Sequence, residues 1–135
     1  GAELLFGGEP ASDKGYFVSP TVFAGAKPDM RIVREEIFGP VITFLDMNSE
    51  SLDSLAAQAN DTHYGLAAVI WSRDISRAHK LARKIRAGSV RINTSGNVDP
   101  AVPFGGFKQS GFGRDLSRHA IDNYVGLKTT WFQHA

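Results

Sequence analysis

The stretch whose residue types could best take part in binding or catalysis is Glu35-Glu36-Ile37-Phe38-Gly39-Pro40, which begins with two adjacent carboxylates. An apolar run that we expect to be a buried strand starts within it, and ligands of open α/β sheets bind in crevices at strand ends. There a carboxylate can accept hydrogen bonds from a ribose diol, and an aromatic ring can pack on a nicotinamide. The spacing alone favours the alternative of a solvated acidic pair before a core strand, because acidic side chains are mostly exposed.

A second candidate is the glycine-rich stretch at residues 103–115. Its glycines permit close approach of the backbone to another group. Gly106 and Gly111 have the spacing of a phosphate loop, but Phe112 stands where that loop needs lysine, and the Gly111-x-Gly113 pair lacks the third glycine of the dinucleotide fingerprint. The alternative is a structural loop, rich in turns, that ends at a helix cap.

The remaining constellations are weaker. Ser110 with Asp115 and His119 could suggest a hydrolase triad, but Lys108 replaces the first glycine of G-x-S-x-G and triad members are normally far apart in the chain. The four histidines show no metal-ligand spacing, so we expect no metal site. Basic residues at 73–86 are more typical of the solvated face of a helix than of a nucleic-acid site, since no aromatic residues interleave with them.

The composition narrows the chemistry further. The 135 residues include no cysteine, which excludes disulfides, thiolate metal sites and cysteine nucleophiles within this chain. This fits a reducing compartment, and we expect a cytoplasmic protein. The net charge of +1 gives no overall attraction to nucleic acid or membrane, and no apolar run approaches the ~18 residues of a membrane span. Because the chain begins with Gly1 rather than Met, we expect a piece of a longer polypeptide.

Alternating strands and helices must position these residues. Three apolar runs predict strands, at residues 38–45, 66–71 and from 90 to 92. Between them lie two amphipathic helices, one over residues 49–60 capped by Ser49, the other begun by Asp74 and ended by Gly88. This order implies βαβ units, and therefore an α/β fold with a parallel sheet and covering helices.

The two ends of the chain have a different pattern. Near the start, residues 4–6 predict a strand, and the apolar segments on either side of Pro20 predict an extended segment at a sheet edge. Near the end, a long loop over residues 93–113 leads to a helix capped by Asp115. The alternating tail at 125–132 predicts a strand that seeks a sheet edge, often on another subunit. We therefore divide the chain into a catalytic-domain part, 1–122, and an oligomerisation arm, 123–135.

Taken together, the segments resemble the C-terminal portion of the aldehyde dehydrogenase superfamily. They occur in family order and at family spacing over essentially the whole chain. The matching stretches are Gly15-Tyr16-Phe17, Pro20-Thr21-Val22-Phe23, Glu35–Val41, Ala59-Asn60, Tyr64–Ala68, Ala87–Val90, Ile92-Asn93 and Pro103–Arg114. The tail from Lys108 to Trp131 looks most like the branch that acts on γ-glutamyl-γ-aminobutyraldehyde and related ω-amino aldehydes.

The resemblance implies roles for four residues. Glu36 would hydrogen-bond the ribose of the nicotinamide, and Phe38 would support the nicotinamide ring. Phe104 would line the aldehyde tunnel. Val98 would also face the substrate, at a position where many relatives carry an aromatic residue, which alters the expected shape of the tunnel.

The resemblance also implies a mechanism that this chain cannot complete. In the family a cysteine thiolate attacks the aldehyde, hydride passes to NAD or NADP, and a glutamate-activated water hydrolyses the thioester. The cysteine, the glutamate and most cofactor contacts would lie upstream, so we expect no catalytic residue here and no activity from the chain alone. It would supply one wall of the site for a small aldehyde and an arm that forms a homo-oligomer. The alternative is a non-catalytic oligomerisation or binding module.

Overall fold

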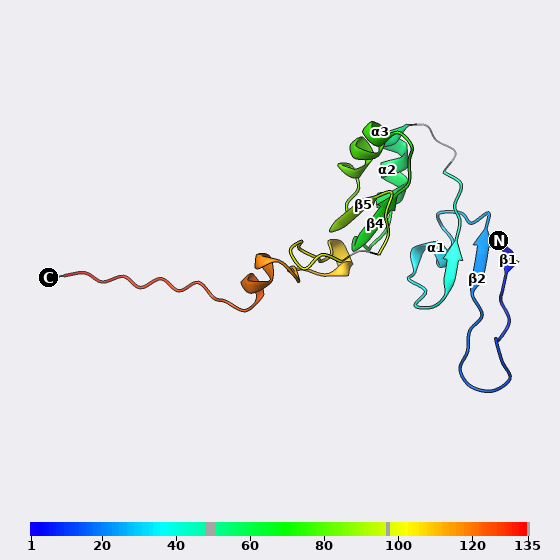
Figure 1. The fold of residues 1–135 in the computed structure, drawn as a ribbon, viewed down its shortest axis with the longest axis horizontal. Helices are drawn as coiled ribbons and strands as arrows, with labels where there is room; N and C mark the ends of the chain where they lie inside the picture. Colours follow the sequence, from blue (N-terminus) through cyan, green and yellow to red (C-terminus); the bar gives the residue numbers. More distant parts are fainter. Residues whose placement is uncertain (48–50, 97, 135) are drawn as a thin grey trace. The chain divides into compact units, whose positions relative to one another are not determined.

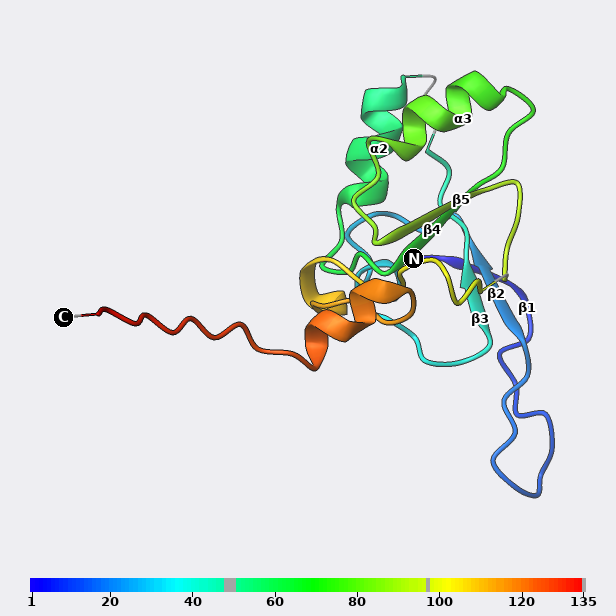
Figure 2. The same ribbon diagram turned by 60° about the vertical axis from the view of Figure 1, so that its left-hand side comes forward.

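The computed structural model describes residues 1–47, 51–96 and 98–134. Within them the chain forms two compact units, Gly1–Glu50 and Ser51–Ala135 (Figures 1 and 2). Each unit has its own small sheet, and each is described by itself below. The mixture of strands and helices confirms the α/β class.

The first unit is built on a three-stranded sheet in the order β1-β2-β3. Its strands are β1 (Glu3–Phe6), β2 (Thr21–Ala24) and β3 (Val41–Thr43). β1 is antiparallel to β2, and β2 is parallel to β3. The expectation of an edge segment at Pro20 was therefore wrong, because the strand that follows is central. The missing N–H of Pro20 lies outside the ladder, where it removes no sheet hydrogen bond.

A short helix and a turn connect β2 to β3. The helix, α1 (Arg31–Arg34), was not predicted and has only four residues. β3 begins at Val41 rather than at Phe38, because the preceding residues form tight turns in which Gly39 N donates to Ile37 O (2.8 Å) and Val41 N donates to Gly39 O (2.8 Å). The acidic pair and Phe38 consequently lie on the connection before the strand.

The second unit contains a parallel pair of strands with two helices. The pair is β4 (Ala67–Ile70) and β5 (Ser89–Ile92), and α3 (Ile75–Ala82) joins them, which confirms the predicted βαβ unit. α3 packs against β5 and against α2 (Leu52–Asn60) (Figure 2). β3 belongs to the first unit, where it pairs with β2, so the expectation that it shares a sheet with β4 and β5 remains a prediction.

Helix ends follow local side-chain chemistry. Asp74 begins α3 as predicted, and its Oδ1 accepts a hydrogen bond from Arg77 N (2.9 Å). α2 is capped by Ser51, whose Oγ accepts from Ser54 N (3.4 Å); the predicted cap, Ser49, lies outside the described residues. α3 ends at Ala82, and turns rather than a regular helix continue toward Gly88.

The C-terminal region departs most from prediction. The glycine-rich stretch contains one 3₁₀ turn, η1 (Lys108–Ser110), and the last helix is a 3₁₀ helix, η2 (Arg118–Asn123), capped by Ser117 rather than Asp115. The cause is the left-handed backbone at Leu116 (φ 61°) and Ser117 (φ 53°), which no α-helix can include. Residues 125–134 have no regular secondary structure; a strand needs a pairing partner, so the strand and the arm remain predictions.

Very little of the apolar surface is buried. Among the described residues the buried hydrophobic side chains are Ala26, Ala56 and Ala78, and no large side chain is fully enclosed. Large apolar side chains are exposed in both units, among them Tyr16, Phe38, Trp71, Phe112, Leu127 and Trp131. Extended exposed apolar surface marks an interaction site in a native protein. None of the helices in the described part of the chain is long and apolar enough to cross a bilayer.

Candidate functional site

The two adjacent glutamates have different surroundings. Arg31 Nε donates to Glu35 Oε1 (2.8 Å) across one turn, an i,i+4 ion pair on the surface. This hydrogen bond lowers the pKa of Glu35 and raises the pKa of Arg31. Glu36 is exposed, and its carboxylate has no hydrogen bond or ion pair within the described residues. Arg31 thus occupies one carboxylate oxygen of Glu35, whereas both oxygens of Glu36 can accept hydrogen bonds from another molecule.

An aromatic ring follows two residues later. The side chain of Phe38 is 96% exposed, and the chain then turns through Gly39 and Pro40 into β3. Pro40 O accepts a hydrogen bond from Thr21 N (2.9 Å), which fixes the end of this turn to the central strand. The first unit therefore presents an exposed carboxylate and an exposed aromatic ring just before a strand, and neither has a hydrogen-bond, ion-pair or ring partner among the described residues.

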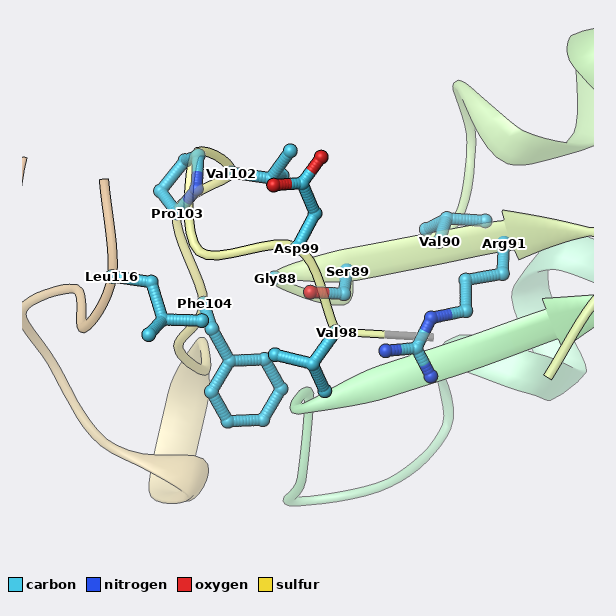
Figure 3. A pocket seen from close by; sticks show the side chains of 10 residues that line it. All are labelled: Gly88, Ser89, Val90, Arg91, Val98, Asp99, Val102, Pro103, Phe104 and Leu116. Atoms are coloured by element: carbon cyan, nitrogen blue, oxygen red, sulfur yellow. The ribbon is translucent and has the colours of Figure 1, made fainter. Parts of the chain in front are cut away.

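The second unit contains a cavity of about 350 Å³ beside the start of β5. The strand supplies one side, including Ser89 and Arg91, and the loop before and at Phe104 supplies the other. Figure 3 shows Val98 next to the ring of Phe104, with Leu116 also beside it. The structure thus brings together Val98 and Phe104, the two residues that the sequence analysis assigned to the substrate.

Phe104 is fixed by its own loop. Its N–H donates to Asp115 O (2.8 Å) and its carbonyl accepts from Asp115 N (2.7 Å), an isolated antiparallel bridge. Arg114 Nη1 donates to Gly106 O (3.0 Å) and Gly113 O (2.5 Å), and its guanidinium lies 4.8 Å from the centre of the Phe107 ring. These bonds join the loop to itself, which fits the structural alternative of a loop rich in turns.

The glycines of this region allow two backbones to cross in contact. A Cβ on Gly88 would lie 1.7 Å from Gly105 O, and a Cβ on Gly106 would lie 2.5 Å from Ser110 Cβ. Atoms cannot approach so closely, so both positions require a residue without a side chain. The start of β5 and the loop that carries Phe104 are consequently held against each other.

Similarity to known proteins identifies the family. The model of the aldehyde dehydrogenase family matches residues 1–130. The chain belongs to the aldehyde dehydrogenase family. Among curated relatives it is 44% identical over 131 residues to the putative aldehyde dehydrogenase DhaS of Bacillus subtilis, covering 97% of this chain and 26% of that protein. To the NADP/NAD-dependent aldehyde dehydrogenase PuuC of Escherichia coli it is 47% identical over 114 residues, covering 84% and 23%.

Solved structures of the family agree with the fold. An aldehyde dehydrogenase from Bacillus cereus, solved as its NAD⁺ complex, superposes with a TM-score of 0.90 at 48% identity, over 98% of this chain and 26% of that one. The aldehyde dehydrogenase KauB from Pseudomonas aeruginosa gives 0.89 at 47% identity, over 97% and 26%. The chain spans about a quarter of the length of these family members.

Several candidates from the sequence have structural roles in this family member. Ser110 Oγ accepts from Gly65 N (3.0 Å), and Asp115 pairs with Phe104 through its backbone. His119 Nδ1 lies 4.0 Å from Asp122 Oδ2, and His119 makes no hydrogen bond to Ser110 or Asp115 in the described residues. The described residues hold no hydrolase triad, and no group of three His, Asp or Glu side chains gathers there as a metal site would need.

Sequence reasoning missed Lys108 and Asn60 as a connected pair. Lys108 Nζ donates to Asn60 O (2.8 Å) and to Thr62 O (3.0 Å), across more than forty residues of chain. The Asn60 side chain in turn bonds the backbone before β5. Both residues occur in the family stretches quoted above, but nothing in their spacing shows that they meet.

Proposed function

We propose that this chain is the C-terminal portion of a longer NAD(P)-dependent aldehyde dehydrogenase that oxidises an aldehyde to a carboxylate. The observation that carries the proposal is the family match over residues 1–130, together with a TM-score of 0.90 to a relative solved as its NAD⁺ complex. The chain spans 26% of that relative, so most of the enzyme would lie outside it.

Two residues of the first unit would contact the cofactor. Glu36 has a carboxylate without a partner in the described residues, and Phe38 has an exposed ring, which together fit a ribose diol and a nicotinamide. Glu36 would accept hydrogen bonds from the ribose hydroxyls and so orient the sugar, while Phe38 would limit movement of the ring. NAD(P)⁺, when bound, would supply the acceptor for the hydride of the substrate.

Two residues of the second unit would form a wall for the aldehyde. Val98 and Phe104 line the same cavity, and their apolar side chains would exclude water from the aldehyde. Valine is smaller than an aromatic residue, so this wall would leave room for a bulky or long substrate. The resemblance of the tail to the ω-amino aldehyde branch supports an aldehyde such as a γ-glutamylamino aldehyde.

The arm at 123–135 would join subunits into a homo-oligomer. Its alternating residues include Leu127 and Trp131, whose side chains are 105% and 93% exposed. Residues 125–134 form no strand with the rest of the described chain, which leaves their backbone hydrogen-bonding groups open to a partner strand. Pairing with a sheet edge of another subunit would satisfy both the backbone and the apolar side chains.

The test is turnover of an aldehyde with NAD⁺ or NADP⁺, followed by NADH or NADPH absorbance. The chain has no cysteine, so the nucleophile must come from the longer protein. We expect the longer protein to be active and the 135-residue chain to be inactive. Activity of the short chain would overturn the assignment of roles. A folded longer protein that oxidises no aldehyde would favour the alternative, a non-catalytic binding or oligomerisation module.

A further inference from the structure

We propose that Lys108 is a positioning residue that sets the place of Phe104 in the substrate wall. The inference rests on the proposed function, because it assumes that Phe104 contacts the aldehyde. Lys108 does not line the cavity itself; it lies four residues after Phe104 and bonds to another part of the second unit. Three observations connect its ammonium group to the geometry of the wall.

The first observation is the anchor of the lysine. Its Nζ donates to Asn60 O (2.8 Å) and Thr62 O (3.0 Å), at and just beyond the C-terminal end of α2. The last carbonyls of a helix lack partners within the helix, and a positive charge is favoured near them. The backbone of Lys108 is left-handed (φ 55°), a conformation that persists for such a residue only where its surroundings hold it.

The second observation is that the anchor point is itself fixed. Asn60 Nδ2 donates to Lys84 O (2.8 Å), and Asn60 Oδ1 accepts from Arg86 N (2.7 Å). These bonds attach the end of α2 to the segment that leads directly into β5. Lys108 is therefore connected, through Asn60, to the segment that leads into the strand side of the cavity.

The third observation is one carbonyl shared by both sides of the cavity. Gly65 O accepts from Gly88 N (2.9 Å) and from Phe107 N (2.9 Å), while Gly65 N donates to Ser110 Oγ (3.0 Å). Gly88 lines the cavity, and Phe107 immediately precedes Lys108. The start of β5 and the loop with Phe104 are thus both hydrogen-bonded to this single residue, Gly65.

These contacts give the consequence of losing the ammonium group. Without the ammonium group, the left-handed backbone of Lys108 loses its side-chain anchor to Asn60 O and Thr62 O, and the adjoining bond from Phe107 N to Gly65 O weakens. The crossing at Gly88 and Gly105 leaves no free space, so relaxation of the loop moves Phe104 relative to Val98. A displaced Phe104 ring reduces the space available to bulky aldehydes more than the space available to small ones. The proposed cofactor contacts, Glu36 and Phe38, lie in the other unit.

The test compares three variants of the complete enzyme. Lys108→Met keeps the length of the side chain and removes its donors, Lys108→Arg keeps the charge, and Lys80→Met removes a charge from the exposed Lys80 of α3 as a matched control. We measure kcat/KM for phenylacetaldehyde and for acetaldehyde. We expect their ratio to fall about tenfold in Lys108→Met, since small misplacements in a site have effects of this order or larger. The fall should be smaller in Lys108→Arg and absent in Lys80→Met.

A second measurement does not depend on activity. Amide hydrogen exchange at Phe107 and Gly88, the two donors to Gly65 O, should become faster in Lys108→Met and stay unchanged in Lys80→Met. Lys108→Met could instead lower the melting temperature while the ratio of kcat/KM for phenylacetaldehyde to that for acetaldehyde stays unchanged or rises. That result would overturn the positioning role, because it would show that Lys108 only stabilises the fold. Unchanged exchange would overturn it as well. If Lys108→Met does not fold, Lys108→Gln, which also removes the charge, takes its place, and the substrate ratio and the exchange rates are judged in the same way.

Failure of the proposed function is recognised separately. A folded wild-type enzyme that oxidises neither aldehyde, nor any other tested, contradicts the proposed function and with it the role of Phe104. An active wild type with no change in ratio contradicts only the inference about Lys108.

Discussion

Glu35 and Glu36 carry the same side chain, and the ion pair with Arg31 distinguishes them. The hydrogen bond from Arg31 lowers the pKa of Glu35, so this pair stabilises the folded chain above the ordinary pKa of a glutamate. The stabilisation is lost as the pH falls through the lowered pKa. Its size is small because both side chains are well exposed to water. Glu36 has no such partner among the described residues, which is consistent with its proposed contact with the ribose.

Substitution of each glutamate by glutamine in the complete enzyme separates the two roles. Glu36→Gln should slow hydride transfer about tenfold or more, because a poorly oriented nicotinamide is far from the reactive geometry. The dissociation constant of the cofactor should change less. Glu35→Gln, the matched control, should leave both nearly unchanged. Single-turnover formation of NADH measures the rate, and equal rates for Glu36→Gln and wild type would remove Glu36 from the site.

At the scale of elements, the second unit depends on the crossing of β5 with the glycine-rich loop. Parallel strands β4 and β5 with α3 form the βαβ unit, and the loop after β5 returns across the first residues of that strand. Gly88 and Gly105 meet there with no space for a side chain. The crossing therefore determines where Phe104 lies in the cavity beside β5.

Two glycine substitutions test the crossing. In Gly88→Ala the new Cβ would meet backbone, the carbonyl of Gly105 at 1.7 Å, which cannot move aside like a flexible side chain. We expect a loss of stability of about 3 kcal/mol or more, at the upper end of what overpacking costs. Gly39→Ala is the control, since the nearest atom to its added Cβ is Ile37 Cγ2 at 4.0 Å. Thermal unfolding of the complete enzyme measures both, and matching midpoints would contradict the crossing.

At the scale of the whole molecule, the chain leaves most of its large apolar side chains in water. Its buried hydrophobic residues in the described part are three alanines, which cannot supply the burial that a stable domain requires. The exposed side chains occur in both units and not only in the tail; examples are Phe17, Phe44 and Trp71. This distribution fits a chain whose apolar surfaces are covered by further polypeptide.

The isolated 135-residue chain should therefore self-associate or unfold without cooperativity. Sedimentation velocity and thermal unfolding measure this directly. Removing residues 125–135 should not restore a monomer, because exposed apolar residues remain in both units. A stable monomer with a cooperative transition, in either form, would contradict the proposal that this chain is part of a larger enzyme.

The sequence by itself determined the family, the alternation of strands and helices, and the start of α3. Family motifs in register over the whole chain need no structure to be recognised, and the comparison confirmed them. The cap at Asp74 follows from a side chain three residues from its donor, and the apolar runs of β4 and β5 are equally local. The roles of Glu36, Phe38, Val98 and Phe104, and the cytoplasmic location, remain predictions.

Only the tertiary structure decided which segments meet. Periodicity does not identify the partner of a strand, so the parallel pairing of β3 with β2 was not predicted. Likewise, the last helix begins only after Leu116 and Ser117, because these residues adopt a left-handed backbone that their side chains do not predict. Lys108 reaches Asn60 across more than forty residues, and hydrogen bonds of that range are fixed by packing and not by local sequence.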